Sequence, residues 1–227
     1  MQQLTYFDRF TIFFLLFKVD DATSAYLSNV IRTERQQYDS LEIPFLQRGR
    51  EFFKMCNDDS RHYRVFKSRV PGLQIKAVHF SRDSALAGVS SAVIDADVAT
   101  CLSYEFRKES REAVAARKSN RIVEEAVHYV NKHSHLYRRV GDLGIKGLFN
   151  REFRMKGVWK IYEESGKAFL AYEDSDELDD RYPRFKIGRV AASARTACMF
   201  EPLPTIHGIP QTRVTFVGRV DVSFFRF

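Results

Sequence analysis

Charged and apolar side chains alternate from Arg151 to Tyr162, and one of the two alternating sets combines an arginine with the only tryptophan of the chain. Successive side chains of a β-strand point to opposite faces, so this pattern predicts a strand with one face turned inward. The predicted inward set is Arg151, Phe153, Met155, Trp159 and Ile161. A guanidinium binds a phosphate or an acidic head group through two parallel hydrogen bonds, but a carboxylate of the protein would serve it equally well. The strand therefore either covers an ordinary core or lines a cavity that holds a molecule with a polar or charged end.

A candidate partner for such a molecule is a glutamate in the strand predicted from Ile122 to Val130. Glu125 shares a strand face with Val123 and Val127, whereas the adjacent Glu124 must face the other way. The pattern leaves open which of the two faces solvent. Burying a carboxylate without a partner is costly, so an inward Glu125 requires an arginine or a ligand hydroxyl beside it.

Metal chemistry has little support in the sequence. His133 and His135 are two residues apart and would share a strand face, but no carboxylate follows at a suitable spacing. The acidic run from Glu173 to Asp180 lacks the glycine and the terminal glutamate of a calcium loop, and it is typical of an exposed loop. We therefore expect no metal and no cofactor.

Catalysis is not indicated either, because the sequence has no serine elbow, no glycine-rich phosphate loop and no cysteine in a recognisable reactive setting. We expect no catalytic residues. An enzyme remains the alternative if His128, Tyr129 and Tyr137 line a cavity, since such groups can act as acids and bases.

The composition favours a cytoplasmic domain with an anionic partner. The 227 residues are 44% hydrophobic, and the three cysteines, Cys56, Cys101 and Cys198, are widely spaced, as in a reducing compartment. A formal charge of +7 favours a phospholipid surface or nucleic acid. The apolar segment Phe10–Phe17 is far shorter than the roughly 20 residues that span a bilayer. We therefore expect peripheral contact with membranes at most.

Periodicity predicts an α+β domain. Helical spacing is expected over residues 22–38, from Pro44 to Cys56, and after Asp95 or Asp97, where an aspartate can cap the helix. Before the third helix, strands are expected at residues 63–68 and 73–80, paired as a hairpin, and at 86–94. After it, one antiparallel meander is expected at residues 122–130, 136–140, 151–162, 167–172, 189–201 and 212–222. A strongly curved sheet that grips a helix leaves an internal hollow.

Three short motifs lie along this order of elements: Asn-Lys-His-Ser at 131–134, Arg-Glu-Phe at 151–153, and Thr-Arg-Val-Thr at 212–215, followed by Val-Asp at 220–221. Their order and spacing resemble the steroidogenic acute regulatory protein-related lipid-transfer (START) family, which has a similar Asn-x-His-Ser, an Arg-Asp-Phe and a closing Thr-Lys-Val-Thr. The resemblance covers about residues 43 to 221. None of the motifs is specific alone.

The resemblance implies a helix-grip fold, in which a curved antiparallel sheet around helices encloses a hydrophobic cavity for one lipid or sterol-like molecule. Arg151 matches the arginine of the Arg-Asp-Phe signature. With Glu125 it is expected to meet the polar end of the ligand, while Phe153, Met155 and Trp159 touch the apolar body. The expected function is non-catalytic binding of the lipid and its transfer between membranes, with transient contact to an anionic membrane surface.

The chain departs from the family pattern at its end. Residues 43–227 are expected to form the START-like domain, but they stop where the family's C-terminal lid helix begins. Residues 1–42 are expected to form an apolar segment and an amphipathic helix. Either the domain is an incomplete or degenerate member of the family, or the segment Phe10–Phe17 covers the cavity in place of the lid. The glycine-containing loop Gly141–Asn150 is the candidate gate.

Nucleic-acid binding is the alternative function. Arg154, Lys156 and Lys160 share the outward face of the predicted strand, and Lys146 and Arg151 lie near them in the sequence. Basic residues among aromatic ones can follow a phosphate backbone. They would serve equally well on anionic lipid head groups, so we expect an anionic membrane surface, rather than nucleic acid, to be the partner.

Overall fold

A computed structural model describes residues 22–80, 86–108, 121–144, 149–182 and 188–221. Over these ranges the chain forms α2 (Ala22–Thr33), α3 (Glu42–Cys56), β1 (Tyr63–Phe66), β2 (Gln74–His79), β3 (Leu86–Ile94), α4 (Val98–Phe106), β4 (Ile122–Tyr129), β5 (Ser134–Gly141), β6 (Asn150–Tyr162), β7 (Lys167–Asp174), β8 (Arg189–Ala191), β9 (Ser193–Ile206) and β10 (Ile209–Asp221). The α+β prediction is confirmed. No helix in these ranges is long and apolar enough to cross a bilayer.

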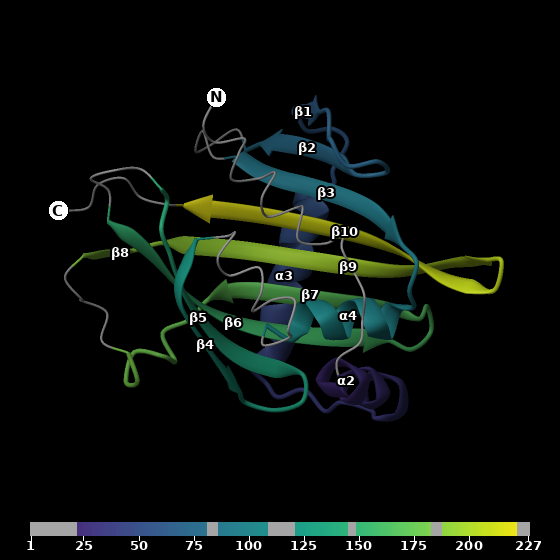
Figure 1. Ribbon diagram of the computed structural model, residues 1–227, viewed down its shortest axis with the longest axis horizontal. Coiled ribbons are helices and arrows are strands. Elements are labelled where there is room, and N and C mark those ends of the chain that lie inside the picture. The colour runs from purple at the N-terminus through teal and green to yellow at the C-terminus, as the bar shows by residue number, and fades with distance from the viewer. Residues whose placement is uncertain (1–21, 81–85, 109–120, 145–148, 183–187, 222–227) are drawn as a thin grey trace.

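All the strands belong to one curved sheet (Figure 1). Its order is β1-β2-β3-β10-β9-β7-β6-β5-β4, with every neighbouring pair antiparallel. The chain passes through α4 between β3 and β4, which lie at distant positions in the sheet. The later strands then form the predicted meander back to β10, which pairs with β3.

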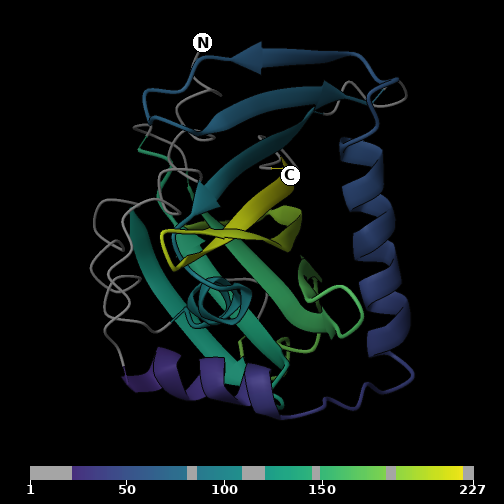
Figure 2. The ribbon, with the colours of Figure 1, turned by 90° about the vertical axis from the view of Figure 1, so that its right-hand side faces the viewer.

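The helices cover opposite faces of the sheet. Figure 2 shows α4 nearly end-on inside the curve, with α2 across one end, while α3 runs along the outer side. We call the face toward α4 the inner face and the face toward α3 the outer face.

Each face has its own apolar core. The inner cluster joins α2 and α4 to β6, β7, β9 and β10 through Leu27, Val30, Leu102, Phe106, Trp159, Leu170, Phe200 and Val214, among others. The outer cluster joins α3 to the reverse side of the same strands through Phe45, Leu46, Phe52, Val158, Phe169, Ala171 and Val217, among others. Because alternate residues of a strand face opposite ways, one sheet serves both cores.

Local chemistry explains where several elements begin and turn. The Asp97 carboxylate accepts a hydrogen bond from the Thr100 amide at 2.8 Å, so it caps α4 as predicted. Gly72 has a φ of +76°, as the third residue of a type II turn requires, and the Leu73 amide closes that turn on the Val70 carbonyl at 3.3 Å.

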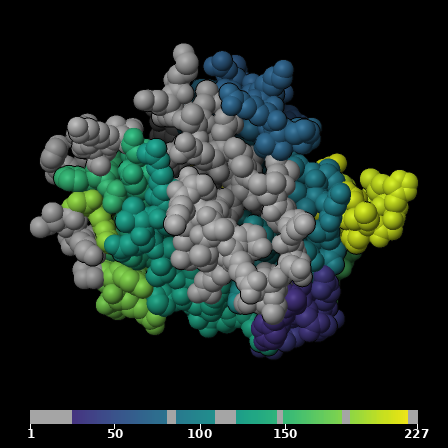
Figure 3. Space-filling view, in the orientation of Figure 1, coloured from purple at the N-terminus to yellow at the C-terminus, as the bar shows by residue number. Residues whose placement is uncertain are grey.

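Some sequence predictions were wrong in detail. The first helix ends at Thr33 instead of residue 38, and the strand expected at 189–201 is divided into β8 and β9. The short β8 pairs with β6 in parallel, an exception to the expected antiparallel meander. The paired tip of β9 and β10 projects from the body of the molecule, where Ile206 and Ile209 are exposed (Figures 1 and 3).

The acidic run from Glu173 to Asp180 was predicted to be an exposed loop, and this prediction was wrong in part. Strand β7 continues to Asp174, and Glu173 is buried between Arg48 at 3.1 Å and Arg195 at 3.2 Å. Leu178 is also fully buried. The two arginines are far from Glu173 in sequence, so the local pattern could not reveal them. The segment Phe10–Phe17 lies outside the described residues.

Candidate ligand-binding face

The alternation predicted for β6 is confirmed by its neighbours. Odd-numbered residues pair with inner-face positions of β5, and even-numbered residues contribute to the outer side. Met155 and Ile161 pack against the inner cluster, and Phe153 is buried on the same face. Strand β6 therefore presents one mixed apolar and polar face to the inside of the curve.

Trp159 is part of the apolar inner cluster. Its side chain is 1% exposed within the inner cluster, and its indole N–H donates to the Lys132 carbonyl at 3.2 Å. The ring of Phe106 meets it edge-on, with ring centroids 6.4 Å apart. The tryptophan thus anchors α4 to the sheet.

Arg151 is buried at the other end of β6, with 1% of its surface exposed. It lies between Gly141 of β5 and Val190 of β8, and its guanidinium donates to the Phe149 carbonyl at 2.6 Å. Part of the expected gate, residues 145–148, lies outside the described ranges, and so does Lys146. The start of β6 therefore carries a cation that is enclosed by the fold.

Glu125 and Glu124 point to opposite faces of β4. Glu125 pairs across the sheet with Arg139 and accepts a hydrogen bond from the Tyr137 hydroxyl. Glu124 instead contacts Arg138 at 3.1 Å and also Arg189. This resolves the alternative that the sequence left open, with Glu125 on the inner face.

Sequence reasoning missed the centre of the inner polar region, formed by His135, Gly157 and Tyr172. These three residues are aligned across β5, β6 and β7. The imidazole of His135 is completely buried, and burial, assisted by Lys108 and Arg107, holds its pKa well below the usual range. Burial likewise raises the pKa of the Tyr172 phenol well above its ordinary value. The alignment depends on strand pairing, which single-strand periodicity does not give.

The two histidines that were considered for metal binding are separated by the fold. His133 lies just before the start of β5, between the Glu42 carboxylate at 2.9 Å and the Gln36 side-chain oxygen at 3.2 Å. His135 points to the inner face. Within the described ranges, no group of three or more His, Cys, Asp and Glu residues could hold a metal ion.

The residues of the enzyme alternative are also divided between the faces. His128 contacts the Tyr182 hydroxyl at 3.1 Å and Arg181 at 3.0 Å. Tyr129 and Tyr137 belong to the inner set, because Tyr129 pairs with His135 and the Tyr137 hydroxyl binds Glu125. The structure does not assemble the three into one acid–base group.

The outward basic residues of β6 are paired with acids or aromatic rings. Arg154 contacts Glu152 and Asp179, each at 2.7 Å, and Lys156 contacts Glu177 at 3.0 Å. The Lys160 ammonium lies 5.2 Å from the centre of the Tyr38 ring. Glu152 is itself buried and also forms ion pairs with Arg138 at 2.8 Å and Arg189 at 3.4 Å. The predicted basic stripe is therefore largely neutralised within the protein.

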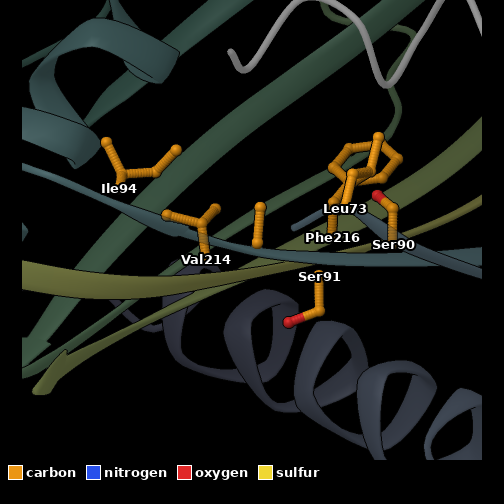
Figure 4. A pocket seen from close by; sticks show the side chains of 7 residues that line it. Leu73, Ser90, Ser91, Ile94, Val214 and Phe216 are labelled. Carbon is orange, nitrogen blue, oxygen red and sulfur yellow. The ribbon is translucent and has the colours of Figure 1, made fainter. Parts of the chain in front are cut away.

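A shallow recess opens on the inner face of β3 and β10 and encloses about 10 Å³. Figure 4 shows Ser90, Ile94, Val214 and Phe216 directed to this side of the sheet, whereas Ser91 points to the opposite side, toward α3. Ligand pockets commonly hold about 300–1,000 Å³. The recess has room for about one water molecule and is too small to hold a lipid.

Comparison of the fold identifies its class. No protein-family model and no curated protein sequence matches the chain. Solved structures do match. They include human StAR-related lipid transfer protein 5 (TM-score 0.61, 13% identity, 84% of this chain and 86% of that chain), human STARD10 (0.58, 16%, 86% and 72%) and the lipid transfer and protein localization domain of human StarD13 (0.55, 14%, 84% and 87%).

These similarities extend over most of each chain, at identities too low to transfer an activity. The molecule has the helix-grip fold of START lipid-transfer domains. The resemblance inferred from the three motifs is therefore confirmed at the level of the fold.

Proposed function

We propose that this protein binds a single lipid or sterol-like molecule, without catalysis, against the inner face of the curved sheet and transfers it between membranes. The observation that carries the proposal is the division of this face. Its apolar residues are packed beneath α4, whereas Arg151, Glu125, Tyr137 and His135 are gathered on β4, β5 and β6. A START-type fold with this division suits an amphipathic ligand.

The apolar part of the ligand supplies the driving force. Each square ångström of apolar surface removed from water contributes roughly 25 cal/mol, before the cost of immobilising the ligand is subtracted. Phe153 and Met155 are the proposed contacts of the apolar body, with Trp159 at the packed end of the same face. Arg151 and Glu125 are the proposed contacts of its polar end.

Contact with membranes is proposed to be peripheral and electrostatic. The chain carries a formal charge of +7, which favours an anionic surface at about 1 kcal/mol for each basic residue near it. Residues 43–227 are the proposed lipid-binding unit. The preceding α2 contributes to the same inner cluster, and its Ser28 hydroxyl lies 2.8 Å from that of Ser103 on α4.

Lipid uptake from vesicles tests the proposal. The protein is incubated with vesicles of phosphatidylcholine that carry a small fraction of cholesterol, diacylglycerol, phosphatidylserine or oleate, and is separated by size before its lipids are extracted. We expect at least one lipid class to remain with the protein at no more than one molecule per chain. If the folded protein retains none of them but binds a single-stranded oligonucleotide in a salt-dependent manner, the nucleic-acid alternative replaces the proposal.

A further inference from the structure

Two buried polar side chains on the inner face lack hydrogen-bond partners within the described part of the chain. Neither ring nitrogen of His135 has a partner, and the Tyr172 hydroxyl also has none. Their ring centroids are 5.5 Å apart, and His135 is completely buried while Tyr172 is 5% exposed. Buried polar groups in folded proteins are nearly always paired, because leaving one unpaired is costly. Two such groups side by side are therefore a candidate site for a bound polar group.

The strand between them leaves room for their side chains to meet. Gly157 is aligned with His135 on one side and with Tyr172 on the other. A Cβ atom at Gly157 would lie 2.4 Å from the Tyr172 Cε1 and 2.9 Å from the His135 Nε2. A glycine is therefore required here for both rings to lie over the bare backbone of β6.

The surroundings of this pair are aromatic, and two cations, Lys108 and Arg107, lie near it. The His135 ring lies 4.3 Å from the Phe106 ring and 5.6 Å from the Tyr129 ring, measured between centroids. The Lys108 ammonium, 5.0 Å from the centre of the Tyr172 ring, is paired with Glu105 at 2.5 Å. The nearby lysine is therefore already neutralised by a carboxylate of the protein, and the Arg107 guanidinium lies over the Tyr129 ring, 5.0 Å from its centre.

The neutral His135 and Tyr172 side chains themselves suit an uncharged polar group. A neutral imidazole offers one donor and one acceptor, and a phenol hydroxyl offers both. A hydroxyl group can use both kinds of site, whereas a phosphate or carboxylate needs unpaired cations or several donors. Burial keeps the imidazole in its neutral form.

We propose that His135 and Tyr172 together bind a hydroxyl group of the ligand, and that the ligand is therefore an uncharged, hydroxyl-bearing lipid. This inference rests on the proposed lipid-binding function and specifies the chemistry of the polar end. Gly157 is a positioning residue, because it allows the two side chains to approach.

The test measures the affinity of the full-length protein for pairs of probes that differ in one hydroxyl group. Cholesterol, hexadecanol and dioleoylglycerol are each measured against a counterpart without the free hydroxyl, namely cholestene, hexadecane and acetylated dioleoylglycerol. Oleate and phosphatidylserine serve as charged probes. We expect the protein to bind at least one hydroxyl-bearing probe about 3- to 10-fold more tightly than its counterpart, the range that one or two hydrogen bonds give.

Two variants locate the effect. Tyr172→Phe removes one hydroxyl with little change of shape, and His135→Phe removes both ring nitrogens. Both are expected to abolish the preference for the hydroxyl while they still bind the counterpart. Tyr162→Phe makes the same change on the outer side, where Tyr162 packs against the outer cluster, and should keep the preference. Urea unfolding confirms that each variant is folded. If His135→Phe does not fold, Tyr172→Phe alone tests the hydroxyl site.

Each contrary result has its own meaning. The hydroxyl site is overturned if the protein binds each hydroxyl-bearing probe and its counterpart with equal affinity, or if it prefers oleate or phosphatidylserine. Either result leaves lipid binding intact. A structure of the loaded protein with only a water between His135 and Tyr172 also overturns it. Failure of the folded wild-type protein to bind any apolar probe overturns both the site and the proposed function.

Discussion

One contribution to the destabilisation of this protein by acid should come from His135. The imidazole is fully buried, and its pKa in the folded state is held well below the ordinary value by burial and by the nearby Lys108 and Arg107. In the unfolded chain its pKa is about 6.5. Below that pH the unfolded chain takes up a proton that the folded chain does not, so the free energy of unfolding falls as the pH falls. At pH 7.5 and above, this contribution to the pH dependence is nearly absent.

The size of the effect follows from the unfolded pKa. Between pH 7.5 and 5.5, a histidine that stays neutral when folded and titrates near 6.5 when unfolded lowers the free energy of unfolding by about 1.4 kcal/mol. The fall continues until the pH reaches the folded-state pKa. In a chain of this size such a change is measurable, because the whole stability of a domain is about 5–15 kcal/mol.

Urea unfolding at pH 7.5, 6.5 and 5.5 measures this contribution as a difference between proteins. Other titrating groups act in the wild type and in His135→Phe alike, so they cancel in the comparison. We expect the wild type to lose about 1.4 kcal/mol more than His135→Phe across this range. His79→Gln replaces an exposed histidine and should behave as the wild type does. Equal pH dependence in the wild type and His135→Phe would refute a buried, neutral His135.

The remaining predictions concern packing and the candidate ligand contacts. Trp159→Ala should lower the free energy of unfolding by about 3–5 kcal/mol and also weaken lipid retention, since it leaves a cavity beneath α4; a loss below about 1 kcal/mol would contradict its core position. Arg151→Gln should reduce lipid retention with a smaller loss of stability, and equal destabilisation with unchanged bound lipid would remove Arg151 from the site. Gly157→Ala should cost about 1–3 kcal/mol in urea unfolding, because its Cβ would overlap Tyr172, and an unchanged stability would show that the rings are not held over it. Glu152→Ala should cost about 3–5 kcal/mol, because it leaves the buried Arg138 without its closest acid, and an effect near zero would show that this ion pair is not needed.

The inner face of β6 could be predicted from the sequence because alternation is a local property. The period of two from Arg151 to Tyr162 determines which side chains share a face, and the pairing of β6 with β5 and β7 agrees with it. The cap of α4 at Asp97 is similarly local. The fold class followed from the order of such elements together with the family motifs.

The parts that could not be predicted depend on contacts between distant segments. His135 and Tyr172 are brought to either side of Gly157 only by the register of three strands. The acidic Glu173 is buried because Arg48 and Arg195 reach it from α3 and β9. The periodicity within one element contains no information about such partners, so the run appeared to be an exposed loop.

Native mass spectrometry of the purified protein tests lipid binding most directly. The protein is recorded before and after incubation with the cholesterol, diacylglycerol and phosphatidylserine vesicles, and the bound mass is identified by dissociation. Our account predicts a complex with the mass of one lipid molecule added to one chain. Only the bare mass of the folded protein, before and after incubation with every vesicle, would contradict it.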